Sequence, residues 1–224
     1  MIEWNEVIYA DCMNEENGLP TLEDKSIDLC LTDPPYGIDF QTRYEYNKQE
    51  YYDDKYKGFN WNIKWFKEIL RICNGIIFTP GMKNLYDWII YKKPNYELKF
   101  WYKSNDANHR TIEPFLLYGK IKNISHLGMS ISRPQKKQGD YIHPTIKNIK
   151  VWEYFIKKLK PISVIDPFIG SGTTAEVCTK LGIPWLGYEL NEVYSQDINK
   201  RLNGCVKEPQ QVGLMGYMNG GNND

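Results

Sequence analysis

The residues from Val164 to Thr174 read VIDPFIGSGTT: an apolar strand, a carboxylate, a glycine-rich turn and the start of a helix. Glycines let the backbone of such a turn come close to a ligand, and the helix that follows offers free N–H groups. Asp166, at the end of the strand, can accept from an ammonium or hydroxyl group, and Glu189, after the next strand, can hold two ribose hydroxyls. The stretch therefore predicts a cofactor-binding strand-turn-helix unit, with a tight turn that binds nothing as the alternative.

On either side of this unit, apolar residues recur with the periods of strands and helices. Strands are predicted at 6–9, 26–32, 75–79, 162–166 and 184–188, helices around 65–70, 85–89, 149–159 and 173–181, and a hairpin-like pair of strands at 98–103 and 114–118. Strands that alternate with helices of this length form a mainly parallel sheet with helices on both faces. The fold class is therefore predicted to be α/β. One domain is expected over 1–203, with a long irregular stretch at 119–143 and a flexible C-terminal tail at 204–224.

A second motif, Asp33-Pro34-Pro35-Tyr36, directly follows one of the predicted parallel strands. Open α/β sheets bind ligands at this end of their strands. The lone pair of an exocyclic amine is delocalised into its ring, so the nitrogen attacks poorly unless acceptors for its hydrogens localise that pair. Asp33 and the Pro34 carbonyl can supply two such acceptors on a stiff Pro-Pro backbone. Tyr36 offers a face on which a flipped base can stack.

The composition fits a folded protein with a buried core and limits its partners. Of 224 residues, 42 % are hydrophobic and 14 % aromatic, and 28 Lys and Arg balance 28 Asp and Glu. A net charge of zero argues against a uniformly positive nucleic-acid-binding surface. The charges are unevenly spread, however, since acidic side chains prevail in residues 1–60 and basic ones in residues 118–160. Neutrality therefore leaves room for a localised positive patch.

The cysteines and the N-terminus predict a soluble, cytoplasmic protein. Five scattered Cys and three His, with no C-x-x-C pair, indicate neither a disulfide framework nor a metal site. The N-terminal residues lack the basic charges of a signal peptide, and no apolar run approaches the length of a membrane-spanning helix.

The two motifs, in this order along the chain, resemble the permuted β-class of the DNA amino-methyltransferases, which use S-adenosylmethionine to methylate N6 of adenine or N4 of cytosine. Further segments match in the family's order: Tyr9–Cys12, Glu113–Phe115, His143–Asn148 and Gly187–Tyr194. The resemblance covers about residues 7–203, and Ala10, Ile146 and Asn148 depart from the family's pattern. This shared order of motifs is more specific than any one of them.

The resemblance implies a Rossmann-like, seven-stranded methyltransferase sheet, circularly permuted to begin at its third strand, with a small recognition insert. It places S-adenosylmethionine over the glycine-rich turn, and it makes Asp33, Pro34, Pro35 and Tyr36 catalytic. The residues it places around the cofactor are Asp11, Cys12, His143, Thr145, Asp166, Phe168, Gly170, Ser171, Gly172, Thr173, Thr174, Glu189 and Asn191. The sequence contains no Pro-Cys dipeptide, the nucleophile motif of cytosine-C5 methylation, so that chemistry is not expected.

Three basic or aromatic stretches have less specific interpretations. The insert at 119–143 is expected to contact DNA phosphates, with a solvated basic loop as the alternative; its candidate residues are Lys120, Lys122, Arg133, Lys136 and Lys137. The tyrosine-rich residues 36–60 form either a loop that closes over a flipped base or an ordinary surface loop. The lysines from Lys147 to Lys160 are interpreted as the exposed face of a helix.

The predicted function is site-specific DNA methylation at adenine N6, by base flipping and direct transfer from S-adenosylmethionine. The Asp with which the Asp33–Tyr36 motif begins favours adenine as the target, and methylation of cytosine N4 is the alternative within the same chemistry. An NAD-dependent oxidoreductase would use the glycine-rich turn but leave 33–36 unexplained, and a non-catalytic DNA-binding module would leave Asp33 unexplained. The expected partner is double-stranded DNA in a bacterial or phage-infected cell, with no membrane and no metal, and a homodimer is left open.

Overall fold

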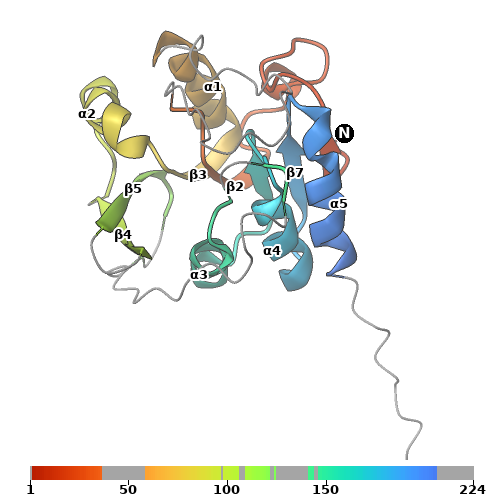
Figure 1. Cartoon of the computed structure of the whole chain (residues 1–224). Helices are drawn as coiled ribbons and strands as arrows, with labels where there is room; N and C mark the ends of the chain where they lie inside the picture. The colour runs from red at the N-terminus through yellow and green to blue at the C-terminus, as the bar shows by residue number, and fades with distance from the viewer. Residues whose placement is uncertain are drawn as a thin grey trace, which may run out of the picture.

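A computed structural model describes residues 2–36, 59–96, 98–105, 109–121, 124, 141–143 and 146–205. A seven-stranded sheet runs through the middle of these residues, with helices on both of its faces (Figure 1). The predicted α/β class is confirmed. Within the same ranges, none of the helices combines the length and the apolar character needed to cross a membrane.

The sheet is mainly parallel, as predicted. Its strands are β1 (Glu6–Ile8), β2 (Ile27–Thr32), β3 (Cys73–Phe78), β4 (Lys99–Asn105), β5 (His109–Gly119), β6 (Val164–Asp166) and β7 (Trp185–Tyr188). They lie in the order β1-β7-β6-β2-β3-β5-β4. The first five in this order are parallel, whereas β5 runs antiparallel to β3 and to β4. The β4–β5 pair is the hairpin expected from 98–103 and 114–118.

The helices divide between the two faces of the sheet. They are α1 (Phe59–Ile72), α2 (Gly81–Tyr91), α3 (Ile149–Leu159), α4 (Thr173–Leu181) and α5 (Ser195–Asn203), with 3₁₀ turns η1 (Leu19–Thr21) and η4 (Glu192–Tyr194). Leu29 and Leu31 of β2 join the core under α3, α4 and α5, whereas Cys30 between them joins the core under α1 and α2. Both faces of β2 are therefore buried from Leu29 onward, which explains the apolar run Leu29–Leu31.

The parallel strands bring residues from distant parts of the sequence to one edge of the sheet. Asp33 follows β2, Thr79 follows β3, Asp166 ends β6 and Glu189 follows β7. The carboxyl ends of parallel strands share one edge, so these four side chains emerge together. The antiparallel β5 brings its first half to the same edge, because Leu116 pairs with Phe78 at the end of β3 and Glu113 precedes it.

Trp65 of α1 is fully buried and should be a main contributor to stability. Its ring lies edge-on to the rings of Phe66 and Phe78, at centroid distances of 5.9 and 5.6 Å. Trp65→Ala is expected to lower the free energy of unfolding by about 3–5 kcal/mol, because the cavity would not refill. Tyr86→Ala, at a side chain that is 73 % exposed, should change it by less than about 0.5 kcal/mol. Urea unfolding followed by circular dichroism checks both; equal effects would contradict the placement of Trp65.

Candidate active site

The carboxylate of Asp33 lies just beyond β2 and receives three donors on one oxygen. The ammonium of Lys147 is 2.7 Å from Oδ1, and the hydroxyls of Tyr36 and Thr79 donate to the same atom. Among the described residues, all of these donors reach Oδ1 and none reaches Oδ2. The Asp33 side chain is 19 % exposed, so Oδ2 is the oxygen that can accept from a bound molecule.

The prolines of this motif hold the backbone beside Asp33. Pro34 is buried, and the Pro35 carbonyl accepts a hydrogen bond of 3.4 Å from Asn62 Nδ2 of α1. Two successive proline rings fix φ at both positions. The backbone that directly follows Asp33 is therefore restricted in conformation.

Tyr36 is held on both its backbone and its side chain. Its carbonyl accepts a hydrogen bond from Asn84 Nδ2 of α2 at 2.8 Å, and its hydroxyl oxygen lies 2.9 Å from Thr79 Oγ1. A Cβ at Gly81, where φ is +66°, would lie 2.8 Å from Cγ of the Tyr36 ring, so the ring rests on the first turn of α2. Burial, and then the charge of Asp33, raise the pKa of Tyr36 well above its ordinary value. The hydroxyl therefore stays protonated as a donor.

Lys147 connects Asp33 with a second carboxylate. Its Nζ lies 2.5 Å from Glu113 Oε1 and 3.2 Å from the Tyr36 hydroxyl. Burial lowers the pKa of Lys147, but Asp33, Tyr36 and Glu113 raise it more, and the result is well above the ordinary value. The interpretation of Lys147 as part of an exposed helix face is therefore wrong: it precedes Asn148, the N-cap of α3, and its side chain is 13 % exposed. Of the lysines farther along, Lys150 is half-buried, whereas Lys157, Lys158 and Lys160 are exposed as predicted.

Asp166 ties the glycine-rich turn to the Asp33 motif. Thr32 Oγ1 donates to Asp166 Oδ1 at 2.5 Å, and Thr32 is the residue immediately before Asp33. The Thr174 hydroxyl donates to Oδ2, and the Phe168 N–H donates to Oδ1 at 3.1 Å. Burial raises the pKa of Asp166 to about 6, although these three donors lower it. One hydrogen bond between β2 and β6 thus places the two motifs side by side.

The glycine-rich turn leads from β6 into α4 and lies against Glu189. The Gly170 N–H donates to Glu189 Oε2 at 3.0 Å, and the Asn191 N–H donates to Oε1 at 2.8 Å. Gly170 and Gly172 have φ of +51° and +81°, which glycine adopts without strain. A Cβ at Gly170 would lie 2.8 Å from His143 Nε2. Burial raises the pKa of Glu189 to about 7. The turn, the Glu189 carboxylate and the His143 imidazole therefore lie together as a candidate cofactor cradle.

Other predicted cofactor residues surround this turn or support it. The Phe168 ring is half-buried, with its centroid 5.7 Å from that of Trp61 in α1. Ser171 Oγ accepts from Arg201 of α5 at 3.3 Å, and Thr173 begins α4. The backbone N–H of His143 donates to Asp197 of α5 at 2.8 Å, which holds this residue against Gly170.

Asp11, Cys12 and Asn191 have structural contacts of their own. Asp11, three residues after Ile8 at the end of β1, accepts a hydrogen bond from the Met13 N–H at 2.9 Å. Cys12 is buried in the core under α1. Asn191 is the N-cap of η4 and accepts from the Val193 N–H at 3.1 Å. Their role as cofactor contacts stays a prediction.

The structure does not bring the predicted DNA-contacting Lys120 to Asp33. The Lys120 N–H bonds the Asn74 carbonyl at the amino end of β3, whereas Asp33 contacts Thr79 beyond its carboxyl end. The antiparallel direction of β5 causes this separation, because its last residue pairs with Gly75. Some predicted residues lie outside the part of the chain that the structure describes: Lys122, Arg133, Lys136, Lys137 and Thr145. The same holds for 37–58, for 125–140 of the predicted insert and for 206–224 of the predicted tail.

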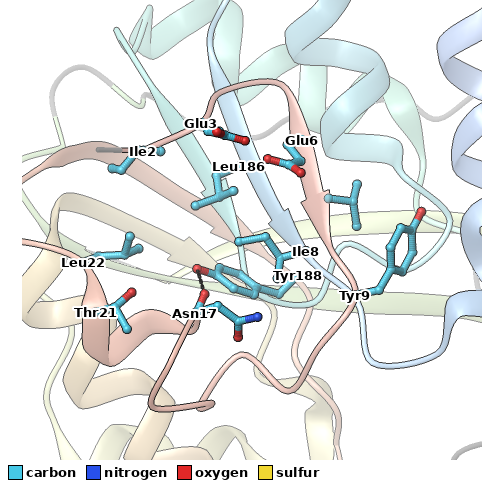
Figure 2. Close-up of a pocket in the computed structure, with 11 residues that line it drawn as sticks. Ile2, Glu3, Glu6, Ile8, Tyr9, Asn17, Thr21, Leu22, Leu186 and Tyr188 are labelled. Carbon is cyan, nitrogen blue, oxygen red and sulfur yellow. Dashed lines mark hydrogen bonds between the residues drawn. The ribbon is translucent and has the colours of Figure 1, made fainter.

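A separate hollow of about 480 Å³ lies beside β1 and β7. Figure 2 shows Leu186, Tyr188 and Ile8 along it, with the Tyr188 hydroxyl donating to the Asn17 carbonyl at 3.2 Å. None of the predicted site residues lines this hollow. Across the described part of the chain, no group of three or more His, Cys, Asp or Glu residues is arranged to hold a metal.

Residues 76–200 match the model of a family described as DNA methylase, of the N6/N4 type. This chain belongs to that DNA methylase family. The matched range contains Asp166 and Glu189, while Asp33 lies before it.

Curated relatives of this DNA methylase include Type II methyltransferases. Type II methyltransferase M.HinfI of Haemophilus influenzae is 26 % identical over 94 % of this chain and 72 % of its own length. M.BamHI of Bacillus amyloliquefaciens is 24 % identical over 91 % of this chain, which spans only 58 % of that relative.

Solved structures share the fold of this DNA methylase. The complex of M1.HpyAVI with S-adenosylmethionine superposes with a TM-score of 0.58 at 21 % identity, over 88 % of this chain and 99 % of the other. The cytosine-N4-specific PvuII DNA methyltransferase gives 0.59 at 17 % identity, over 89 % and 93 %. The predicted methyltransferase sheet is thus confirmed as a fold.

Several residues of this site were not singled out from the sequence. They are Thr32, Thr79, Asn84 and Lys147, while Glu113 was noted only as part of a strand behind the site. Thr32 and Thr79 follow a simple rule, because each lies at the carboxyl end of a predicted parallel strand. Lys147 lies in the His143–Asn148 segment, whose match to the family could have marked it.

Proposed function

We propose that this DNA methylase is a site-specific methyltransferase that acts on N6 of adenine in double-stranded DNA and uses S-adenosylmethionine. The observation that carries the proposal is the hydrogen bond from Thr32 to Asp166. It joins the end of β2, where Asp33 and Pro34 can accept from an amine, to the end of β6, where the glycine-rich turn begins. A base amine and a cofactor bound at these two places would be neighbours.

The residues of the turn fit this cofactor. Gly170 lets the turn lie against His143 where a side chain would collide, Glu189 can accept hydrogen bonds from the two ribose hydroxyls, and Asp166 can accept one from the amino group of the methionine part. When bound, S-adenosylmethionine supplies a methyl group on a positively charged sulfur. M1.HpyAVI, which shares the fold, was solved with this molecule.

Asp33 and Pro34 would prepare the base amine for attack. A carboxylate and a carbonyl that accept its two hydrogens localise the nitrogen lone pair and stabilise the positive charge that develops on the nitrogen. The hydrogen bonds on Oδ1 and the Pro-Pro backbone hold both acceptors in place before the base arrives. The base must leave the DNA stack to reach them.

Adenine is proposed as the target because the motif begins with Asp. Long-read modification mapping of DNA from cells that express the protein tests this directly. We expect N6-methyladenine within one short sequence motif. Methylation confined to cytosine N4 would overturn the adenine assignment but keep the chemistry, and unmodified DNA would overturn the proposal.

Cofactor affinity should depend on pH through Glu189. Its pKa of about 7 means that the free protein is partly protonated there at neutral pH, whereas ribose hydroxyls bond best to the ionised carboxylate. Binding therefore releases a proton, and affinity should fall about tenfold from pH 8 to pH 6. Isothermal titration of S-adenosylmethionine at several pH values measures this. Glu189→Gln should bind S-adenosylmethionine more weakly, and its affinity should depend less on pH above pH ~6.5. A wild-type affinity that does not change with pH would contradict this role of Glu189.

A further inference from the structure

We propose that Lys147 is a positioning residue for methyl transfer, which with Glu113 holds Asp33 so that Oδ2 is presented to the base amine. This inference rests on the proposed function. Lys147 lies before α3, Glu113 lies in β5 and Asp33 follows β2, so three distant segments meet at one nitrogen. Lys147 Nζ contacts Asp33 Oδ1 at 2.7 Å and Glu113 Oε1 at 2.5 Å.

The burial of this cluster argues for a role in function rather than in stability. The side chains of Lys147 and Glu113 are 13 % and 7 % exposed. Removing such charges from water is unfavourable, and apolar residues of similar volume often give a protein greater stability. The cluster nevertheless lies at the carboxyl edge of the sheet, in contact with the residue that would accept the substrate amine.

The charges of the cluster suit a reaction that creates positive charge. Lys147 alone would neutralise Asp33 and weaken it as an acceptor, but Glu113 adds a second negative charge. The three groups together therefore keep one net negative charge beside the amine. The other groups that face Asp33 are the neutral hydroxyls of Tyr36 and Thr79, and Asp166 is the next carboxyl group whose charge interacts with it.

The charge balance predicts how variants should behave. In Lys147→Met two carboxylates remain without their shared cation, so the pKa of one of them rises. The acid limb of the kcat–pH profile should then move to higher pH. In Glu113→Gln the remaining pair is neutral and Asp33 accepts less well. The double variant Lys147→Met/Glu113→Gln again has one negative charge, so its acid limb should return toward that of the wild type.

The test measures kcat, KM for DNA and the pH profile for the wild type, both single variants, the double variant and Lys147→Arg. Each single variant should lose on the order of tenfold or more in kcat, with KM changed less than about threefold. The kcat of the double variant should equal or exceed that of each single variant. Lys147→Arg should retain most of the kcat that Lys147→Met loses. S-adenosylmethionine binding and thermal unfolding show that each variant is folded.

The positioning role would be overturned if the kcat losses of the two single variants multiplied in the double variant and the acid limb of the kcat–pH profile moved in none of the variants. Methylation by the wild type would in that case still uphold the proposed function. If Lys147→Met does not fold, a double variant slower than Glu113→Gln would overturn it equally. A wild type that methylates no DNA would overturn the proposed function, and this inference with it.

Discussion

Replacing Asp33 by Ala is expected to lower the rate of methyl transfer to DNA by roughly 10²- to 10³-fold, the effect of removing one preorganised partner of a developing charge. Asp33 is proposed to accept a hydrogen bond from the base amine through Oδ2. Its other oxygen, Oδ1, accepts from the hydroxyls of Tyr36 and Thr79, which hold the carboxylate in place. Transfer of tritium from labelled S-adenosylmethionine to DNA, in single-turnover reactions, measures the loss.

A matched control lies at the other end of the same strand. Asp28 of β2 accepts from the Ile162 N–H at 3.1 Å, away from the carboxyl edge of the sheet. Asp28→Ala should cost some stability but leave the transfer rate within about twofold. Asp33→Ala should bind S-adenosylmethionine as the wild type does, because the Asp166 side of the site is unchanged. Equal transfer rates for Asp33→Ala and the wild type would refute the catalytic role.

Replacing Gly170 by Ala should weaken cofactor binding by roughly 10- to 100-fold. At φ of +51° a side chain is strained by about 1–3 kcal/mol. The new Cβ would also lie 2.8 Å from His143 Nε2, inside the proposed cradle. The turn or His143 must therefore move, and with it the N–H that bonds Glu189. Isothermal titration with S-adenosylmethionine measures the change.

Gly182, at the other end of α4, provides the comparison. Its φ is +68°, and a Cβ there would meet no atom within 4 Å. Gly182→Ala thus carries the same kind of backbone strain without a collision and away from the turn. It should lower stability by about 1–3 kcal/mol and leave cofactor affinity unchanged. If both variants lost affinity equally, strain alone would be the cause and the cradle would not be supported.

The layered architecture could be predicted because its signals are local. The apolar pattern and the glycines around α4 predicted Thr173–Leu181 with the bounds that the structure shows. The strand β2 was predicted over 26–32 because the run is rich in residues that favour strands and is followed by the Pro34-Pro35 break, and the structure has it at Ile27–Thr32. Periodicity and turn chemistry depend on neighbours in sequence, so they can be read without the fold.

The contacts of Lys147 could not be predicted in this way. A lysine close to a helical stripe has the sequence pattern of an exposed face, and only the packing of α3 against β5 and β2 turns it inward. The position of Lys120 likewise depends on the direction of β5, which the sequence pattern leaves open. Both are tertiary properties, set by strand order and direction rather than by local periodicity.

The most direct test of the central claim is the chemical identity of the methylated base. Purified protein would be incubated with unmethylated DNA and S-adenosylmethionine that carries a deuterated methyl group, and the DNA would be digested to nucleosides for mass spectrometry. We expect the label in N6-methyldeoxyadenosine, with Asp33→Ala giving almost none. Label only in N4-methyldeoxycytidine would contradict the adenine assignment, and the absence of any labelled nucleoside would contradict methyl transfer to DNA altogether.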